Sequence, residues 1–143
     1  MIIITTQCFY PTIGGIEALM TGMAAAMYKS GKDLLVVADG KNDKSDKIKT
    51  YSIKRYGGWK PIRRIKKARY ISQLCKTSNI EAIYADSWKS IEYLKNINVP
   101  IFVLAHGTEI QKNTESLNFY KIFKQKRIFS SYGNSKQIIA NSN

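Results

Sequence analysis

Three short stretches hold the residues whose types and spacing suit chemistry. The first is the pair Gly14–Gly15, which lies between an apolar run and a helical pattern. The second is Asp86-Ser-Trp-Lys89 and the third is His106-Gly-Thr-Glu109, and each directly follows another apolar run. A strand, a glycine loop and a helix start aim backbone N–H groups and the positive end of a helix dipole at an anion.

His106 is the only histidine of the chain. Its near-neutral pKa would allow the ring to donate or accept a hydrogen bond with a sugar hydroxyl or a phosphate. A structural role is the alternative, but a loop at the end of a buried strand favours function. We expect no metal site, because no second histidine or cysteine cluster is present to complete one.

The other two stretches each have a plain alternative. Gly14–Gly15 lacks the G-x-G-x-x-G spacing of a dinucleotide site, and an ordinary loop that needs positive φ is equally consistent with it. Asp86 and Lys89 would suit a polar acceptor, with Trp88 as a stacking face. A helix cap with Trp88 in the core is at least as well supported.

Strand and helix patterns alternate along the chain. Apolar runs predict strands, and 3.6-residue periodicity predicts the helices between them. The alternation predicts one α/β, Rossmann-like, three-layer domain with a mostly parallel sheet, whose ligands bind at the carboxyl ends of the strands. The expected strands are Ile2–Ile4, Asp33–Asp39, Ile48–Lys54, Ile80–Ala85, Pro100–Ala105 and Gln137–Ala140, and the expected helices are Ile16–Ser30, Pro61–Lys76, Trp88–Asn96 and Asn118–Ser131.

The net charge of +13 is concentrated in the middle of the chain. Residues 41–79 hold 13 Lys and Arg against 2 Asp, a net +11. A dense basic run is usually a solvated helix face, but it also suits an anionic partner such as nucleic acid, an anionic membrane or a phosphorylated substrate. The densest part of the run is Arg63, Arg64, Lys66, Lys67 and Arg69.

Length and composition narrow the class of protein. The 143 residues are enough for one domain with a real core. No apolar run approaches the roughly 20 residues that span a bilayer, and the start does not resemble a signal peptide, so we expect a cytoplasmic protein. Cys8 and Cys75 are expected to be free thiols.

Two motifs resemble one enzyme family. Phe9-Tyr-Pro-Thr-Ile-Gly-Gly-Ile-Glu17 is similar to an F-x-P-x-x-G-G-x-E segment, and Val103-Leu-Ala-His-Gly-Thr-Glu-Ile110 is similar to a strand ending in H-G-x-E. Ile138-Ile-Ala-Asn-Ser142 adds weaker support through its A-N-S triplet. On these motifs the chain resembles the N-terminal half of a retaining glycosyltransferase of the GT-B type, family 4 (group 1).

The resemblance implies a role for each stretch. Such enzymes face two Rossmann-like domains across a cleft, and the N-terminal one mostly receives the acceptor. Gly14, Gly15, Gly107 and Glu109 would approach the diphosphate and sugar of a nucleoside-diphosphate sugar, and His106 would be catalytic beside the transferred sugar. Asp86, Trp88 and Lys89 would lie on the acceptor side. No cofactor or metal is implied.

The resemblance also sets the expected process and its limits. We expect surface polysaccharide or glycolipid assembly, with a glycan or lipid-linked acceptor and a basic helix Pro61–Lys76 suited to an anionic membrane surface. We also expect the C-terminal nucleotide-binding domain to be absent from this chain. Without that domain, the chain should not transfer sugar. Tyr84-Ala-Asp86 stands where many relatives carry a histidine.

Two alternatives stay open at this point. One is a basic module that binds nucleic acid or an anionic membrane without catalysis; Tyr51, Tyr56, Trp59 and Tyr70 lie among its cations. The other is a sugar-nucleotide epimerase of the GT-B type.

Overall fold

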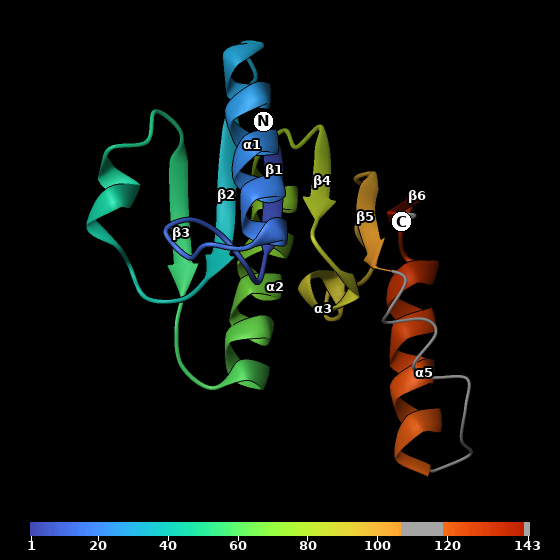
Figure 1. Cartoon of the computed structure of the whole chain (residues 1–143). Coiled ribbons are helices and arrows are strands. Elements are labelled where there is room, and N and C mark those ends of the chain that lie inside the picture. Colours follow the sequence, from blue (N-terminus) through green and yellow to red (C-terminus); the bar gives the residue numbers. More distant parts are fainter. Residues whose placement is uncertain (107–118, 142–143) are drawn as a thin grey trace.

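The computed structural model describes residues 1–106 and 119–141 (Figure 1). Strands and helices alternate along the chain, as predicted. The strands are β1 (Ile2–Thr6), β2 (Leu34–Asp39), β3 (Ser52–Tyr56), β4 (Ala82–Ala85), β5 (Ile101–His106) and β6 (Gln137–Asn141). The helices are α1 (Gly15–Lys29), α2 (Lys60–Thr77), α3 (Trp88–Ile91) and α5 (Phe119–Gly133), with a 3-10 turn η1 (Lys44–Lys47).

All six strands form one parallel sheet in the order β3-β2-β1-β4-β5-β6. The α/β, Rossmann-like prediction is confirmed, and the sheet is wholly rather than mostly parallel. From β1 the chain adds strands outward to β3, then crosses back to place β4 on the other side of β1. The order therefore reverses between β1 and β4, and such a reversal opens a crevice at the carboxyl ends of the two strands.

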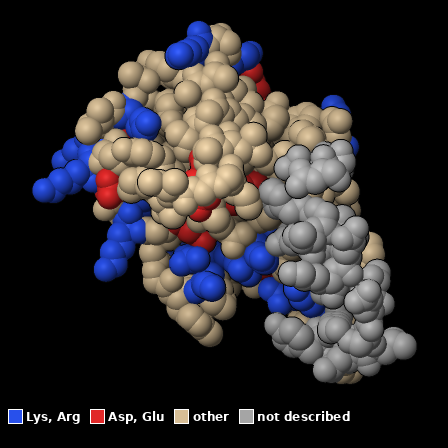
Figure 2. All heavy atoms as spheres, in the orientation of Figure 1, with Lys and Arg blue, Asp and Glu red and all other residues tan. Residues whose placement is uncertain are grey.

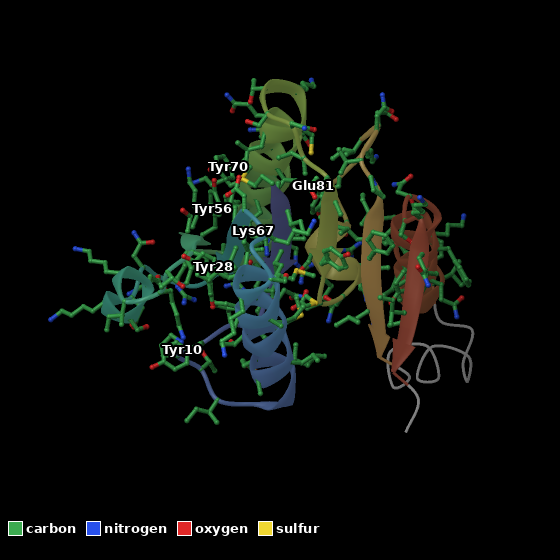
Figure 3. The ribbon with its side chains drawn as sticks, turned by 90° about the horizontal axis from the view of Figure 1, so that it is seen from above. Tyr10, Tyr28, Tyr56, Lys67, Tyr70 and Glu81 are labelled. Carbon is green, nitrogen blue, oxygen red and sulfur yellow. The ribbon has the colours of Figure 1, made fainter. Side chains whose placement is uncertain are left out.

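The two faces of the sheet have separate cores. Along β1, Ile2 and Ile4 pack with Met20 and Ala24 of α1, whereas Ile3 packs with Ala68 and other residues on the opposite face. That alternation follows from the two-residue period of a strand. Figure 3 shows α1 and α2 on opposite sides of the sheet. The second core also contains residues of α3 and α5, so three helices cover that face.

Most expected boundaries agree with the structure to within about two residues. Helix α1 ends at Lys29, just before Gly31, the predicted stop residue, whose φ is 79° and whose N–H donates to the Tyr28 carbonyl at 2.9 Å. The predicted helix Trp88–Asn96 is wrong, because α3 ends at Ile91. The chain then turns, with Asn96 at a φ of 54° and Leu94 buried in the core.

The predicted edge strand begins later than Ile48, at Ser52. Asp43 and Asp46 form a capping box that winds the preceding residues into η1. The side chains and backbone N–H groups of that turn form hydrogen bonds with one another, so the segment forms a turn and does not lengthen β3. Among the described residues, none of the helices is both long and apolar enough to cross a bilayer.

Lys67 lies inside the molecule, which corrects its prediction as part of an anion-binding surface. The residue is 1% exposed. Its ammonium donates to the Thr6 carbonyl at 2.8 Å and lies 2.8 Å from Oδ1 of Asp39. Burial lowers the pKa of Lys67, and the Asp39 carboxylate opposes that shift. The charged group thus ties α2 to the carboxyl ends of β1 and β2.

Replacing Lys67 with Met should destabilise the fold by roughly 3 kcal/mol, because the Asp39 carboxylate would lose one of its cations inside the protein. Urea unfolding at neutral pH measures the change. The neighbouring exposed residue provides the control, since Lys66→Met should lie within about 0.5 kcal/mol of the parent. Equal effects of the two substitutions would contradict the role assigned to Lys67.

Candidate functional site

The candidate site lies at the reversal of strand order, where β1 and β4 end side by side. The Gln7 N–H donates to Oδ2 of Asp86 at 2.7 Å, and the Gln7 side chain donates to the Ser87 hydroxyl at 2.8 Å. The loop after β1 and the loop after β4 are therefore in direct contact. The carboxyl ends of β1 and β4 thus lie side by side, as expected for neighbouring parallel strands.

The third loop follows β5, the neighbour of β4 in the sheet. The backbone of His106 ends that strand and pairs with Asn141 of β6. Parallel pairing of β4 with β5 puts this strand end at the same edge of the sheet. The His106 side chain and the predicted residues Gly107 and Glu109 lie outside the described residues, so their roles stay predictions.

Asp86 is a buried acceptor of hydrogen bonds and is 2% exposed. Its carboxylate accepts from the Thr6 hydroxyl at 2.9 Å, from the Gln7 N–H, and from the Ser90 hydroxyl at 2.5 Å. These contacts hold the end of β1 to the start of α3. The contact with an acceptor that the sequence suggested for Asp86 stays a prediction.

Trp88 belongs to the core, which corrects its prediction as a stacking face for an acceptor. It is 2% exposed and packs in the same cluster as Ile71 and Ile128. The first turn of α3 directs its indole toward the sheet. The alternative prediction, a helix cap with Trp88 in the core, is therefore right about this side chain. Lys89 is half-buried with its ammonium 5.7 Å from the Trp88 ring centroid. Its acceptor role stays a prediction.

Gly14 and Gly15 have backbone conformations open to any residue. Gly14 is extended at a φ of 176°, and neither glycine adopts a left-handed φ. The alternative of a loop that needs positive φ is therefore wrong. A Cβ added to Gly14 would lie 2.3 Å from Oε2 of Glu17, so this glycine makes room for a carboxylate in the first turn of α1.

Gly15 differs from Gly14 in facing open space. A Cβ added there would meet nothing within 4 Å. Helix α1 begins at this residue, and no side chain caps the helix by a hydrogen bond at Gly14. The first N–H groups of a helix lack intrahelical partners and carry the positive end of its dipole. Gly15 thus lies at an open surface at the N-terminal end of α1.

Arg55 holds the loop that leads to Gly14 and Gly15, a role that the sequence did not predict. The Arg55 side chain is 4% exposed and forms two hydrogen bonds of 2.7 Å with the Asp46 carboxylate. It also donates to the Tyr10 carbonyl and lies 5.9 Å from the ring centroid of Phe9. Arg55 therefore links β3 and η1 to the loop that leads into α1. The sequence signal for this role was an arginine directly after the predicted edge strand, which itself follows the acidic pair Asp43 and Asp46.

A hollow of about 210 Å³ lies beside the start of α1. It is bounded by the loop that Arg55 holds and by the first turn of the helix. Its lining residues include Tyr10, Ile13, Gly14, Glu17 and Thr21. Ile13, at 97% exposed, stands at the tip of this loop.

Three of the cations of the basic helix α2 are paired with carboxylates of other elements. Arg63 lies 2.7 Å from Oδ2 of Asp39, and Arg64 lies 3.1 Å from Oε2 of Glu92. With Lys67 buried, Lys66 and Arg69 are the exposed members of the five cations predicted as an anion-binding surface. In Figure 2 a group of basic side chains lies in the lower middle of the view, below a smaller group of acidic side chains, and other basic side chains stand at the upper and left edges.

Carboxylates dominate the immediate surroundings of Cys8. Burial, together with the charges of Asp86, Glu17 and Asp39, raises the pKa of the Cys8 thiol to about 11. The thiolate is the reactive form of cysteine, so almost none is present near neutral pH. Cys8 is therefore a local reporter of whether this edge of the sheet is folded.

At pH 8 the Cys8 thiol should react with a disulfide reagent such as Ellman's reagent at least about tenfold more slowly than a cysteine of ordinary pKa. Stopped-flow absorbance on a Cys75→Ala variant isolates Cys8. Unfolding in urea should restore the ordinary rate. A folded-state rate equal to the unfolded one would contradict the raised pKa.

Comparison with known proteins identifies the family of the chain. A search of curated proteins gives no match. Residues 13–143, which include the start of α1 and the end of β5, match the family described as Glycosyltransferase Family 4. Because the match covers most of the sequence, the chain belongs to Glycosyltransferase Family 4.

Proposed function

We propose that this domain is the acceptor-side half of an enzyme that moves a sugar from a nucleoside-diphosphate sugar to a hydroxyl group. The acceptor is a glycan or a lipid-linked glycan in surface polysaccharide or glycolipid assembly. The observation that carries the proposal is the open surface at Gly15, where α1 starts after β1, one of the two strands at the reversal of strand order. Family membership supplies the reaction class.

In the proposed reaction the donor diphosphate lies against the first N–H groups of α1. Fixed N–H donors stabilise the negative charge that grows on the diphosphate as the sugar leaves. His106, Gly107 and Glu109 would position the transferred sugar, and a second α/β domain would bind the nucleotide. The contribution of this half is orientation of the reacting groups and electrostatic stabilisation, with retention of configuration and no cofactor.

The proposed acceptor side is the loop after β4. Asp86 would act there chiefly by fixing the loop, because its carboxylate already accepts hydrogen bonds from Thr6, Gln7 and Ser90. Lys89 is the nearby cation suited to a phosphorylated or lipid-linked acceptor. Such acceptors are held at membranes, so we propose a peripheral position on the inner face of a membrane.

The rival of a nucleic-acid-binding module loses part of its support. That interpretation needs a row of cations that face solvent between aromatic side chains. Arg63, Arg64 and Lys67 instead form ion pairs with Asp39 and Glu92. No observation favours an epimerase over a transferase.

Replacing Gly15 with Val should lower turnover at least about tenfold in a protein that joins this domain to its nucleotide-binding half, because the side chain would block approach to the backbone of α1. Transfer of labelled sugar from a panel of nucleoside-diphosphate sugars to membrane acceptors provides the assay. The unfolding midpoint should not fall, since the space at Gly15 is open.

Gly22→Val is the matched control, because Gly22 lies in the same helix and also faces open space. That variant should retain full turnover. Unchanged kinetics for Gly15→Val would remove the glycine pair from the donor site. Transfer by the 143-residue chain alone would contradict the need for a second domain.

A further inference from the structure

Helix α5 exposes a stripe of large apolar side chains. Phe119 is 86% exposed, Ile122 39%, Phe123 60% and Phe129 73%. Their spacing of three, four and seven residues places them on one side of the helix. Ile128 and Tyr132 on the other side are buried in the core that α5 shares with the sheet. Helix α5 is therefore fixed by one face and carries a second apolar face outward.

Cations accompany the stripe, and acidic side chains do not. Lys126 is exposed within it, and neither α5 nor α2 contains an aspartate or glutamate. A hollow of about 520 Å³ beside α5 is lined by Tyr93, Lys95, Phe123 and Lys126, among others. Glu92 in its wall has a side chain only 5% exposed and forms ion pairs with Arg64 and Arg127.

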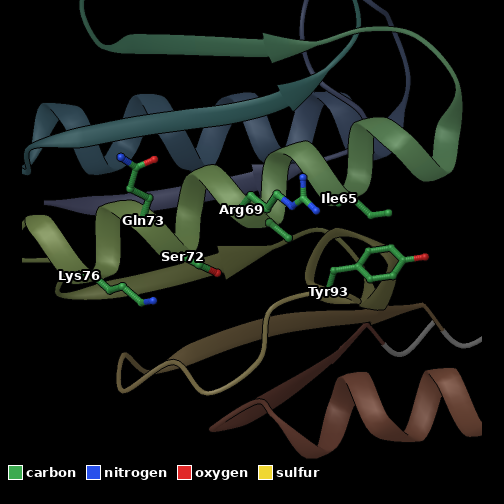
Figure 4. A pocket seen from close by; sticks show the side chains of 7 residues that line it. Ile65, Arg69, Ser72, Gln73, Lys76 and Tyr93 are labelled. Atoms are coloured by element: carbon green, nitrogen blue, oxygen red, sulfur yellow. The ribbon is translucent and has the colours of Figure 1, made fainter.

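The same combination continues onto α2. A second hollow of about 420 Å³ shares Tyr93 with the first and is lined further by Ile65, Arg69, Ser72 and Lys76 (Figure 4). Arg69 and Lys76 are exposed, and so is Ile62 one turn before Lys66. The exposed apolar stripe of α5 and the exposed cations of α2 are joined through Tyr93 into one surface, which we call the α2–α5 face.

We propose that the α2–α5 face docks on an anionic lipid bilayer, with the phenylalanines of α5 in the interface and the lysines and arginines against lipid phosphates. An amphipathic helix with Phe on one side and Lys beside it has the composition that lies in a membrane interface. A second copy of the chain would bring two basic surfaces together, which like charges oppose. A polynucleotide would leave the aliphatic and aromatic stripe largely solvated.

This proposal deepens the proposed function by naming the surface that would meet a lipid-linked acceptor. Figure 1 shows α5 extending beyond the carboxyl end of β5, the edge at which the candidate site lies. Docking through α5 would bring that edge toward the bilayer. The proposal rests on the proposed function only for this consequence, and binding to lipid can be tested with no donor or acceptor present.

Sedimentation of the 143-residue chain with vesicles provides the test. Binding should be strong with phosphatidylcholine vesicles that contain phosphatidylglycerol, weak with phosphatidylcholine alone, and reduced by salt well above about 0.15 M. The double variant Phe123→Ser/Phe129→Ser should bind at least about tenfold more weakly. Lys126→Glu should cost about fivefold or more, since one lysine near an anionic surface accounts for about that factor.

Ile48→Ser and Lys47→Glu are the matched controls. Ile48 is 81% exposed and Lys47 is exposed, and both lie at η1, away from the α2–α5 face. Both should bind vesicles like the parent, and all variants should keep the parent's unfolding midpoint. Equal binding to neutral and anionic vesicles would overturn the proposal. So would a stripe variant that binds normally, a dimer that the stripe variant abolishes, or polynucleotide binding that depends on the stripe.

If vesicle binding follows this pattern while no sugar transfer is found, the docking surface stands and the transferase proposal fails. If transfer is found while vesicle binding does not depend on the α5 stripe, the transferase proposal stands and the docking proposal fails. The two proposals therefore fail separately.

Discussion

The ammonium of Lys67, held at the carboxyl edge of the sheet, is the contact on which the site depends. It reaches the Thr6 carbonyl at the end of β1 and the Asp39 carboxylate at the end of β2. A buried charge is tolerated only with a close partner, so α2 is fixed relative to both strands. Arg63 binds the other oxygen of Asp39 and adds a second tie from the same helix. The carboxyl ends of β1 and β2 are thus held in one arrangement relative to α2.

The loops of the candidate site are built outward from that fixed edge. Thr6, held through its carbonyl by Lys67, donates its hydroxyl to Asp86, which in turn accepts from Gln7 and Ser90. Further along the loop, Arg55 holds Tyr10, and α1 then starts at Gly15 with no capping side chain. The approachable helix start is therefore supported from two sides by buried charged groups, which is how a loop can present backbone donors without moving.

The sequence predicted the architecture well because it depends on local patterns. Apolar runs such as Ile2–Ile4 and a helix stop at Gly31 identify elements without reference to distant residues. Partners far apart in sequence set the rest. Nothing in the run Arg63–Arg69 distinguishes Lys67 from Lys66, and only the packing of α2 against Asp39 makes one a core residue. Trp88 likewise could be a stacking face or a core residue, and only the orientation of α3 decides between the two. Gly14 and Gly15 look alike in sequence, yet only one faces open space.

We propose that the first N–H groups of α1 receive the diphosphate of a nucleotide sugar. Amide NMR of the 143-residue chain, titrated with a nucleoside diphosphate and separately with the matching nucleoside, tests it most directly. We expect the amide signals of Gly15, Ile16 and Glu17 to shift with the diphosphate and not with the nucleoside, and Gly15→Val to abolish the shifts. Shifts confined to the α2–α5 face, with those three amide signals unmoved, would show that the diphosphate does not bind at the start of α1.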